Sequence, residues 1–350
     1  MKKLLLATAV AALSVSAANA APTVYGKAFV GMDYVDIDDE WSNKNEDSVQ
    51  INSYSSRLGF KGSEAITANT DVIYQYEVGI NIDGNEGDDN NIAFKSRDTF
   101  LGFKNDSYGE LRFGRNTSVV DYVNNVVTSG SGFWDNLGSN QLDENENGYN
   151  MTDSGRRDNS VIWMAPKYNN LPLDVALMYK ANESLDDSTV DADAGFAASA
   201  MYDAGTGITF GAAYDNDVNL DGDLLRATAA VDLSKYMAAP VTVGAMYQVA
   251  DFDASQKMGT RGSEKEKGLV VSAKMGLNNF AKPAAVYIQY NNTDNLLGFS
   301  DADSDQIVVG GEYNYKPNMI AHVWAGQNSA DLGGSDYDLL AIGGGLEYKF

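Results

Sequence analysis

The sequence predicts an all-β chain of sixteen antiparallel strands that close into a transmembrane barrel. Apolar residues alternate with polar or small ones in runs of about ten, and about sixteen such runs follow one another. Short connections between the runs take turns with long polar ones. Alternation of period two is typical of strands with two unlike faces, and the regular asymmetry of connections is typical of outer-membrane barrels.

The first element is a targeting segment. Lys2 and Lys3 precede an apolar run, and Ala18-Asn19-Ala20 has the small-residue pattern of a cleavage site. This predicts a secretory signal over residues 1–20 and a barrel over residues 21–350, the alternative being an N-terminal helix. Removing the two lysines from a chain of 25 basic and 49 acidic residues leaves a formal charge of −26.

The strands follow in order along the mature chain. In the first, Val30, Met32 and Tyr34 alternate with Gly31 and Asp33. The predicted strands start near Val24, Val49, Asp71, Ile92, Gly109, Asn159, Leu173, Asp193, Ile208, Asp223, Val241, Gly268, Lys282, Ser304, Met319 and Tyr337. An even number of strands suits a closed up-and-down barrel.

The connections separate the two ends of this barrel. Short ones span residues 105–109, 167–172, 203–207, 234–239, 277–281 and 316–318, whereas long ones span 36–47, 82–91, 116–158, 181–192, 253–267 and 292–303. Most acidic residues lie in the long set, which predicts a negative rim. The connection over residues 116–158 is by far the longest, and loops of that length are usually functional or mobile.

A bilayer explains the alternation. Within hydrocarbon every backbone N–H and C=O must be paired, so the apolar parity of a closed sheet faces lipid and the polar parity lines water. The last strand still alternates over Leu346-Glu347-Tyr348-Lys349-Phe350. Its terminal Phe350 resembles the end of strands read by the outer-membrane assembly machinery, which is therefore an expected partner.

Composition excludes several function classes. The acidic balance argues against nucleic acid, because phosphate contacts need clustered Lys and Arg. The absence of Cys excludes disulfides and thiol chemistry, and a single His, His322, makes Ser-His triads and His-ligated metals poor candidates. We therefore predict no enzyme, no metal and no cofactor.

Three function classes remain from the residues alone. The first is a passive diffusion channel for small hydrophilic solutes. The second is a soluble or surface-attached all-β binding module, such as a lectin or adhesin, which would not need alternating short and long connections. The third is a barrel protease or phospholipase, which would need a Ser/His or Asp/His constellation at its rim.

Four segments resemble a known family. Tyr25-Gly26-Lys27, the stretch SRLGFKG from Ser56 to Gly62, RDTFLGFK from Arg97 to Lys104 and GELRFGR from Gly109 to Arg115 resemble the first five strands of Gram-negative general trimeric porins, both neisserial and enterobacterial. The resemblance implies a water-filled channel for passive diffusion of ions and small hydrophilic solutes. It also implies a homotrimer in the cell outer membrane, surrounded by lipid and lipopolysaccharide.

The same resemblance implies a pore constriction. In that family the third long loop folds into the barrel and faces a basic wall, whose positions here would be Lys27, Arg57, Arg97 and Arg157. Arg156 is an alternative to Arg157. Parity places Lys27 and Arg57 in the lumen class, where a basic group avoids the cost of about 2 to 4 kcal/mol for facing lipid at mid-depth.

Two parts of this constriction fit less well. Arg97 shares its parity class with apolar Leu101 and Phe103. The loop also lacks the family's PEFGGD-like stretch. The segment most similar to it, residues 131–135, ends with Asp135. Asp121 and Asp135 are the candidate acidic residues, and the alternative is that they are solvated loop carboxylates. For the basic residues, the alternative is rim charges or ion pairs between strands.

Overall fold

The computed structural model describes residues 21–84, 94–129, 132–135, 148–168, 171–182, 194–253 and 262–350. The predicted signal over residues 1–20 lies outside this part of the chain. Four short 3-10 helices, η1 (Val119–Tyr122), η2 (Gly132–Trp134), η3 (Leu233–Lys235) and η4 (Leu296–Gly298), occur in connections. Within the described ranges, no helix is long and apolar enough to cross a membrane.

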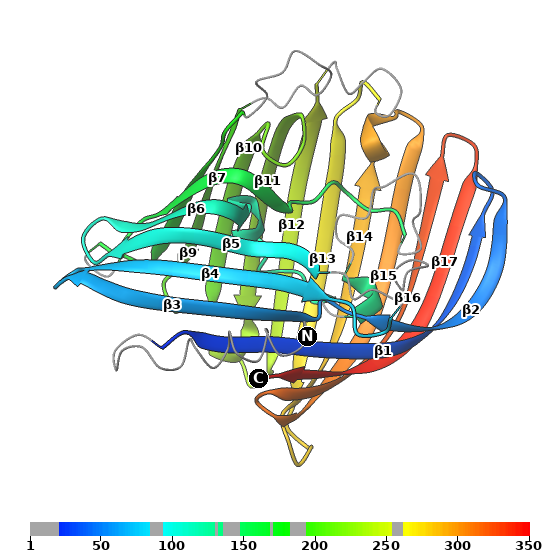
Figure 1. The fold of residues 1–350 in the computed structure, drawn as a ribbon. Helices are drawn as coiled ribbons and strands as arrows, with labels where there is room; N and C mark the ends of the chain where they lie inside the picture. The colour runs from blue at the N-terminus through cyan, green and yellow to red at the C-terminus, as the bar shows by residue number, and fades with distance from the viewer. Residues whose placement is uncertain are drawn as a thin grey trace, which may run out of the picture.

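One antiparallel sheet accounts for all described strands (Figure 1). They are β1 (Thr23–Asp39), β2 (Lys44–Ser53), β3 (Arg57–Thr67), β4 (Thr70–Ile80), β5 (Phe94–Asn105), β6 (Gly109–Thr117), β7 (Arg156–Met164), β8 (Leu173–Lys180), β9 (Gly195–Asp203), β10 (Ile208–Asn216), β11 (Gly222–Asp232), β12 (Val241–Phe252), β13 (Glu266–Leu277), β14 (Ala284–Asp294), β15 (Ala302–Lys316), β16 (Met319–Leu332) and β17 (Asp336–Lys349).

The sheet closes because its first strand pairs with its last. β1 and β17 pair from Lys27↔Lys349 to Asp39↔Tyr337. The other edge of β1 pairs with β2 over one part of its length and with β3 over the rest. β2 and β3 are thus two halves of one barrel strand, interrupted near Ser55, whose φ is 50°. The barrel therefore has sixteen strands, which confirms the predicted fold class.

The observed strands extend further into some connections than the sequence predicts. The expected long loop over residues 36–47 is mostly strand, because β1 continues to Asp39 and pairs there with Lys44 of β2. The side chains in this stretch are polar on the outward face, so the apolar alternation stops although the backbone ladder continues. Polarity here marks the end of the apolar band and not the end of the strand.

Alternate side chains along each strand face outward and inward. Met32, Leu101 and Val323 point outward and are 60%, 56% and 61% exposed. Asp33 and Asn328 occupy the other set of alternate positions in their strands, point inward and are buried. The wall thus has an apolar outer face and a largely polar lumen, as period-two alternation predicts.

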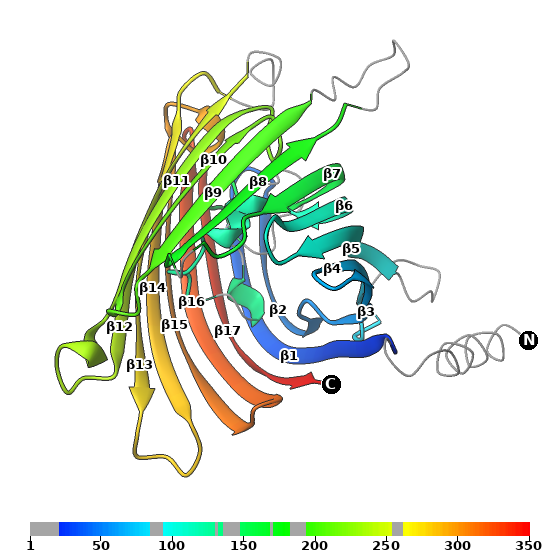
Figure 2. The same ribbon diagram turned by 90° about the vertical axis from the view of Figure 1, so that its left-hand side faces the viewer.

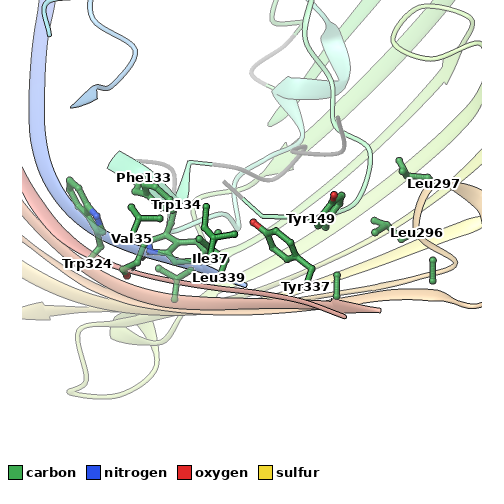
Figure 3. Packing of buried hydrophobic residues seen from close by; sticks show 14 of the residues in the cluster. Val35, Ile37, Phe133, Trp134, Tyr149, Leu296, Leu297, Trp324, Tyr337 and Leu339 are labelled. Carbon is green, nitrogen blue, oxygen red and sulfur yellow. Dashed lines mark hydrogen bonds between the residues drawn. The ribbon is translucent and has the colours of Figure 1, made fainter. Parts of the chain in front are cut away.

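We call the connection between β6 and β7, residues 118–155, the inner loop, because its described residues, 118–129, 132–135 and 148–155, lie inside the barrel (Figure 2). Its described residues join three apolar clusters on the lumen wall. Val119, Val120 and Val123 pack on residues of β7 to β11, whereas Val126 and Met151 pack on β11 to β13. Phe133, Trp134 and Tyr149 pack on β14 to β17 and β1 (Figure 3). The long third loop is folded into the lumen, as expected.

Hydrogen bonds fix the inner loop to the same wall. The N–H of Tyr149 donates to Oδ1 of Asn328 at 2.7 Å, and Nδ2 of Asn328 donates to the Tyr149 carbonyl at 2.9 Å. Nε1 of Trp134 donates to the Ala341 carbonyl at 3.3 Å. Only glycine fits at position 326, because a Cβ there would lie 2.6 Å from the Trp134 ring. Loop and wall are therefore shaped to each other.

Candidate functional site

The lumen wall outside the three apolar clusters carries a line of charged side chains of both signs. None of the three described clusters that hold the loop includes a residue of β3 to β6. On this side, six charged side chains of β1, β3, β4, β5 and β7 follow one another along the wall. We call this set the charged row: Lys27, Arg57, Glu77, Arg97, Asp98 and Arg156. The charged row therefore lies on a part of the wall that takes no part in the three clusters.

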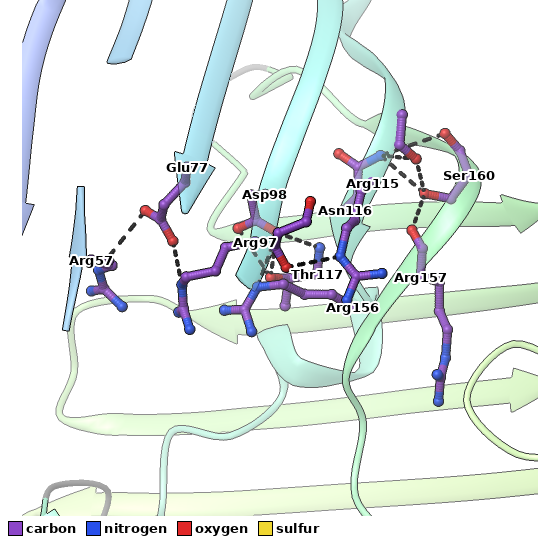
Figure 4. Close-up of polar contacts among 12 residues, drawn as sticks. Arg57, Glu77, Arg97, Asp98, Arg115, Asn116, Thr117, Arg156, Arg157 and Ser160 are labelled. Carbon is purple, nitrogen blue, oxygen red and sulfur yellow. Dashed lines mark hydrogen bonds and ion pairs between the residues drawn. The ribbon is translucent and has the colours of Figure 1, made fainter. Parts of the chain in front are cut away.

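Glu77 is the centre of the charged row (Figure 4). Its buried carboxylate accepts a hydrogen bond from Nε of Arg97 at 2.6 Å and one from the Tyr25 hydroxyl at 3.0 Å. Nε of Arg57 lies 3.8 Å away on the other side. Glu77 thus holds two arginines of neighbouring strands against the wall, where they would otherwise repel each other.

A β-bulge explains why Arg97 faces the lumen. Tyr76 pairs with Thr99 and Val78 with Ser96, so Arg97 and Asp98 together lie opposite Glu77. The extra residue shifts the alternation of β5 by one position. The side chain of Arg97 therefore does not point outward, as its spacing from the outward-facing Leu101 would otherwise require. Bulges commonly re-aim side chains near functional sites.

Arg156 and Arg157 occupy different environments. Nε of Arg156 lies 3.4 Å from Oδ1 of Asp98, and its guanidinium lies near that of Arg97 in Figure 4. Arg157 points away from Arg97 (Figure 4). Its guanidinium donates to the carbonyl of Asn219. The structure thus brings Lys27, Arg57, Arg97 and Arg156 together, whereas Arg157 lies apart with the β10–β11 connection.

Lys27 forms the other end of the charged row. It is the cross-strand partner of Arg57, and its Nζ lies 5.4 Å from the centre of the Phe29 ring. Cations are stabilised over aromatic faces, which helps Lys27 to remain beside a like charge.

The two candidate carboxylates of the inner loop lie towards opposite ends of the row. Asp135 follows η2, whose Phe133 and Trp134 are buried in the wall cluster. Asp135 is exposed to the lumen, yet enclosure by protein raises the pKa of its carboxyl group, while the charge of Lys27 acts in the opposite direction. Lys27 and Asp135 therefore influence each other across the pore.

Asp121 belongs to η1 at the start of the loop. Burial raises the pKa of its carboxyl group, and the neighbouring charge of Asp153 acts in the same direction. The charges of Arg226 and Arg156 oppose this shift. The row and the loop together thus carry four cationic groups and four carboxylates. All four cations lie in the row, whereas two carboxylates lie in the row and two on the loop.

Comparison with known proteins identifies the family of this chain. The family model described as Gram-negative porin matches residues 7–333. The chain belongs to this family. An outer membrane porin protein of Bordetella pertussis is 30% identical over 65% of this chain and 60% of its own length. The major outer membrane protein P.IB of Neisseria meningitidis serogroup B is 26% identical over the whole length of both chains.

A solved structure agrees on the fold. The anion-selective porin from Comamonas acidovorans superposes with a TM-score of 0.68, covers 95% of this chain and 100% of its own, and is 15% identical. The protein is accordingly a porin of the outer membrane, with a closed transmembrane β-barrel.

Parity reasoning missed two acidic members of the charged row in this porin. Glu77 lies between Tyr76 and Val78, so its polar character within an alternating strand is a signal that was available. Asp98 offered no such signal, because its orientation depends on the bulge. Sequence reasoning also missed Arg226, whose fully buried guanidinium donates from Nη2 to Asp153 of the loop at 2.7 Å.

Proposed function

We propose that ions and small hydrophilic solutes pass through the gap between the inner loop and the charged row, which together form the constriction of this porin. The observation that supports the proposal is that described residues of the inner loop pack on the lumen wall, while the charges of Lys27 and Arg156 act on its carboxylates Asp135 and Asp121. Charges at a narrow point act on passing ions over a few Å with little screening. The protein acts as a channel and not as an enzyme, which its family and fold support.

The balance of charge at this constriction predicts weak selectivity. Four cationic and four anionic groups leave it nearly neutral, so the acidic outer rim decides the preference at low salt. Rim charges lie further from the constriction than the Debye length of about 8 Å at physiological ionic strength. We therefore propose a weak preference for cations that fades as salt rises.

Reversal potentials across a KCl gradient in planar bilayers test both statements. Arg57→Ser is expected to strengthen the cation preference, and Asp135→Asn to weaken it. Strong anion selectivity in dilute salt, or no shift with Arg57→Ser, would contradict this placement of charge. That Arg157 belongs to the basic wall stays a prediction. Comparing the reversal potentials of Arg157→Ser and Arg156→Ser decides which of the two arginines acts on passing ions.

The outer surface supports three further assignments. We propose that the apolar band contacts membrane lipid and that the acidic rim lies among lipopolysaccharide headgroups. Outward positions of β1, β15 and β17 include Gly26, Ala28, Gly311 and Gly344, which permit close contact between barrels and so favour a homotrimer. Phe350, whose backbone pairs with Gly26, is the proposed signal for the assembly machinery.

A further inference from the structure

A small pocket lies between the inner loop and the wall across the lumen from β3 to β6. Its volume is about 360 Å³, and its lining includes loop residues 125–128 and side chains of β11, β12, β13 and β15. Thr242 and Lys274 in this lining lie close to the short connections at the ends of β12 and β13. A pocket of this size is at the lower end of those that hold small molecules. It is separate from the charged row.

The pocket presents one positive and one negative group. Nζ of Lys274 lies 2.8 Å from Oε1 and 2.9 Å from Oε2 of Glu312. The two side chains are 38% and 19% exposed, whereas the carboxylate of Glu77 in the charged row is 8% exposed. Both members of this ion pair are therefore accessible to a solute, and partly exposed pairs are weakly held.

The chemistry of the lining favours a particular class of solute. A simple cation is attracted by Glu312 and repelled by Lys274, and a simple anion meets the reverse. A zwitterion places its ammonium on Glu312 and its carboxylate on Lys274, so that both protein charges keep a partner. The partly buried Val127 of the loop adds apolar surface, and Thr242 adds a hydroxyl group.

We propose that this pocket is a weak binding site for small zwitterionic solutes with a short apolar side chain, such as aliphatic α-amino acids, during their passage through the porin. The proposal rests on the channel function proposed above and specifies a class of solute for it. Weak binding suits a channel, because a solute must leave the site as readily as it enters.

Current noise of the intact channel in planar bilayers tests the proposal with three probes of one carbon skeleton. L-leucine carries both charges, leucinamide only the positive one and 4-methylpentanoate only the negative one. We expect leucine to produce saturable excess noise in the millimolar range, and each singly charged analogue to need about tenfold higher concentration. Equal potency of the three probes would overturn the proposal.

Paired variants locate the effect. Lys274→Ala with Glu312→Ala should raise the leucine concentration needed by at least about tenfold, whereas the reversed pair Lys274→Glu with Glu312→Lys, the matched control, should retain binding. Noise is normalised to each variant's own conductance. An unchanged response in the alanine pair, or a loss in the reversed pair as large as in the alanine pair, would contradict the assignment.

Single variants keep the test decisive if the alanine pair fails to fold. Lys274→Gln leaves Glu312 and should shift preference towards leucinamide, and Glu312→Gln should shift it towards 4-methylpentanoate. If neither preference shifts, the pocket is not the site. Normal conductance without a leucine response refutes only this inference, whereas a folded protein that conducts no ions refutes the proposed function itself.

Discussion

At the scale of single residues, Glu77 is central to the charge balance of the proposed constriction. It is the carboxylate that contacts both Arg57 and Arg97, and it also accepts the Tyr25 hydroxyl group. A charge so close to the permeation path acts on ions directly. At 4 Å, two unit charges in water interact by about 1 kcal/mol.

Glu77→Gln is therefore expected to shift the K⁺/Cl⁻ permeability ratio towards chloride by up to about fivefold. Gln retains an oxygen acceptor for Arg97, so the row keeps its shape. Reversal potentials measure the shift, and Asp174→Asn, which alters a carboxylate paired with Lys167 beside a short connection, is the control. Equal ratios for Glu77→Gln and the parent would place Glu77 away from the ion path.

The loop carboxylates predict a dependence on pH. Enclosure by surrounding protein raises the pKa of Asp121 and of Asp135 above the ordinary value of about 3.9 for Asp. A raised pKa means that these groups lose their charge at a higher pH than exposed carboxylates do. As the pH falls from 7, the constriction becomes net positive first, and the preference should move towards anions.

Reversal potentials between pH 7 and pH 4 check this expectation. In the double variant Asp121→Asn with Asp135→Asn, the early part of the shift should be absent, and only the later titration of exposed rim carboxylates should remain. An identical pH profile for parent and double variant would assign the whole effect to the rim.

At the scale of elements, the sequence predicts strands better than it predicts side-chain direction. All sixteen strands were expected near their observed positions, because alternation over about ten residues is a strong signal. One inserted residue leaves no mark in such a pattern. The bulge at Arg97 and Asp98 therefore stayed hidden, and the same limit left Arg156 and Arg157 undecided, since β7 has a register shift opposite residues 114–116.

The position of the inner loop was predictable only from family resemblance. Its anchors are contacts between residues far apart in the chain, such as Trp134 with Ala341 and Tyr149 with Asn328. Local sequence carries no trace of such pairs. Parity alone, by contrast, placed Lys27 and Arg57 in the lumen, because the residues next to each of them pair in regular register, from Thr23↔Lys61 to Lys27↔Arg57.

Loosening the loop should widen the channel. Deleting residues 130–149 is expected to raise single-channel conductance, because the deletion removes Trp134 and Tyr149 from the lumen and leaves the wall closed. Trp134→Ala should give the same trend with more current noise, as a buried Trp contributes about 3 to 5 kcal/mol to packing. Trp41→Ala, at an exposed rim position, is the control. Unchanged conductance in a folded deletion variant would place the loop outside the ion path.

At the scale of the whole molecule, the excess of acid governs behaviour in dilute salt. The charge of −24 for the full sequence lies far from neutrality, whereas the constriction is nearly balanced. Raising KCl from 0.01 M to 1 M shortens the Debye length from about 30 Å to about 3 Å. The cation preference should therefore fall steadily across this series, and a preference independent of salt would locate its source at the constriction instead.

Association is the second property of the whole molecule. Detergent-extracted protein is expected to be a trimer, because small outward residues on β1, β15 and β17 flatten the wall next to exposed apolar side chains such as Val323 and Ile342. Light scattering, with the detergent mass subtracted, gives the number of chains. Gly344→Trp should weaken the trimer, whereas the same change at Gly205, in a short connection, should not. Only monomer in the parent protein would contradict this expectation.

The pairing of β1 with β17 has a consequence for biosynthesis. One edge of β1 pairs with β2 and β3, which follow it directly, but the other edge pairs with β17 and cannot be satisfied until that last strand has been made. Such distant pairing is slow, and unpaired edges invite aggregation. A chain truncated before β17 would leave β1 and β16 with open edges and could not close as a smaller channel. Export in an unfolded form, with closure delayed until the last strand arrives, is therefore built into the topology of this protein.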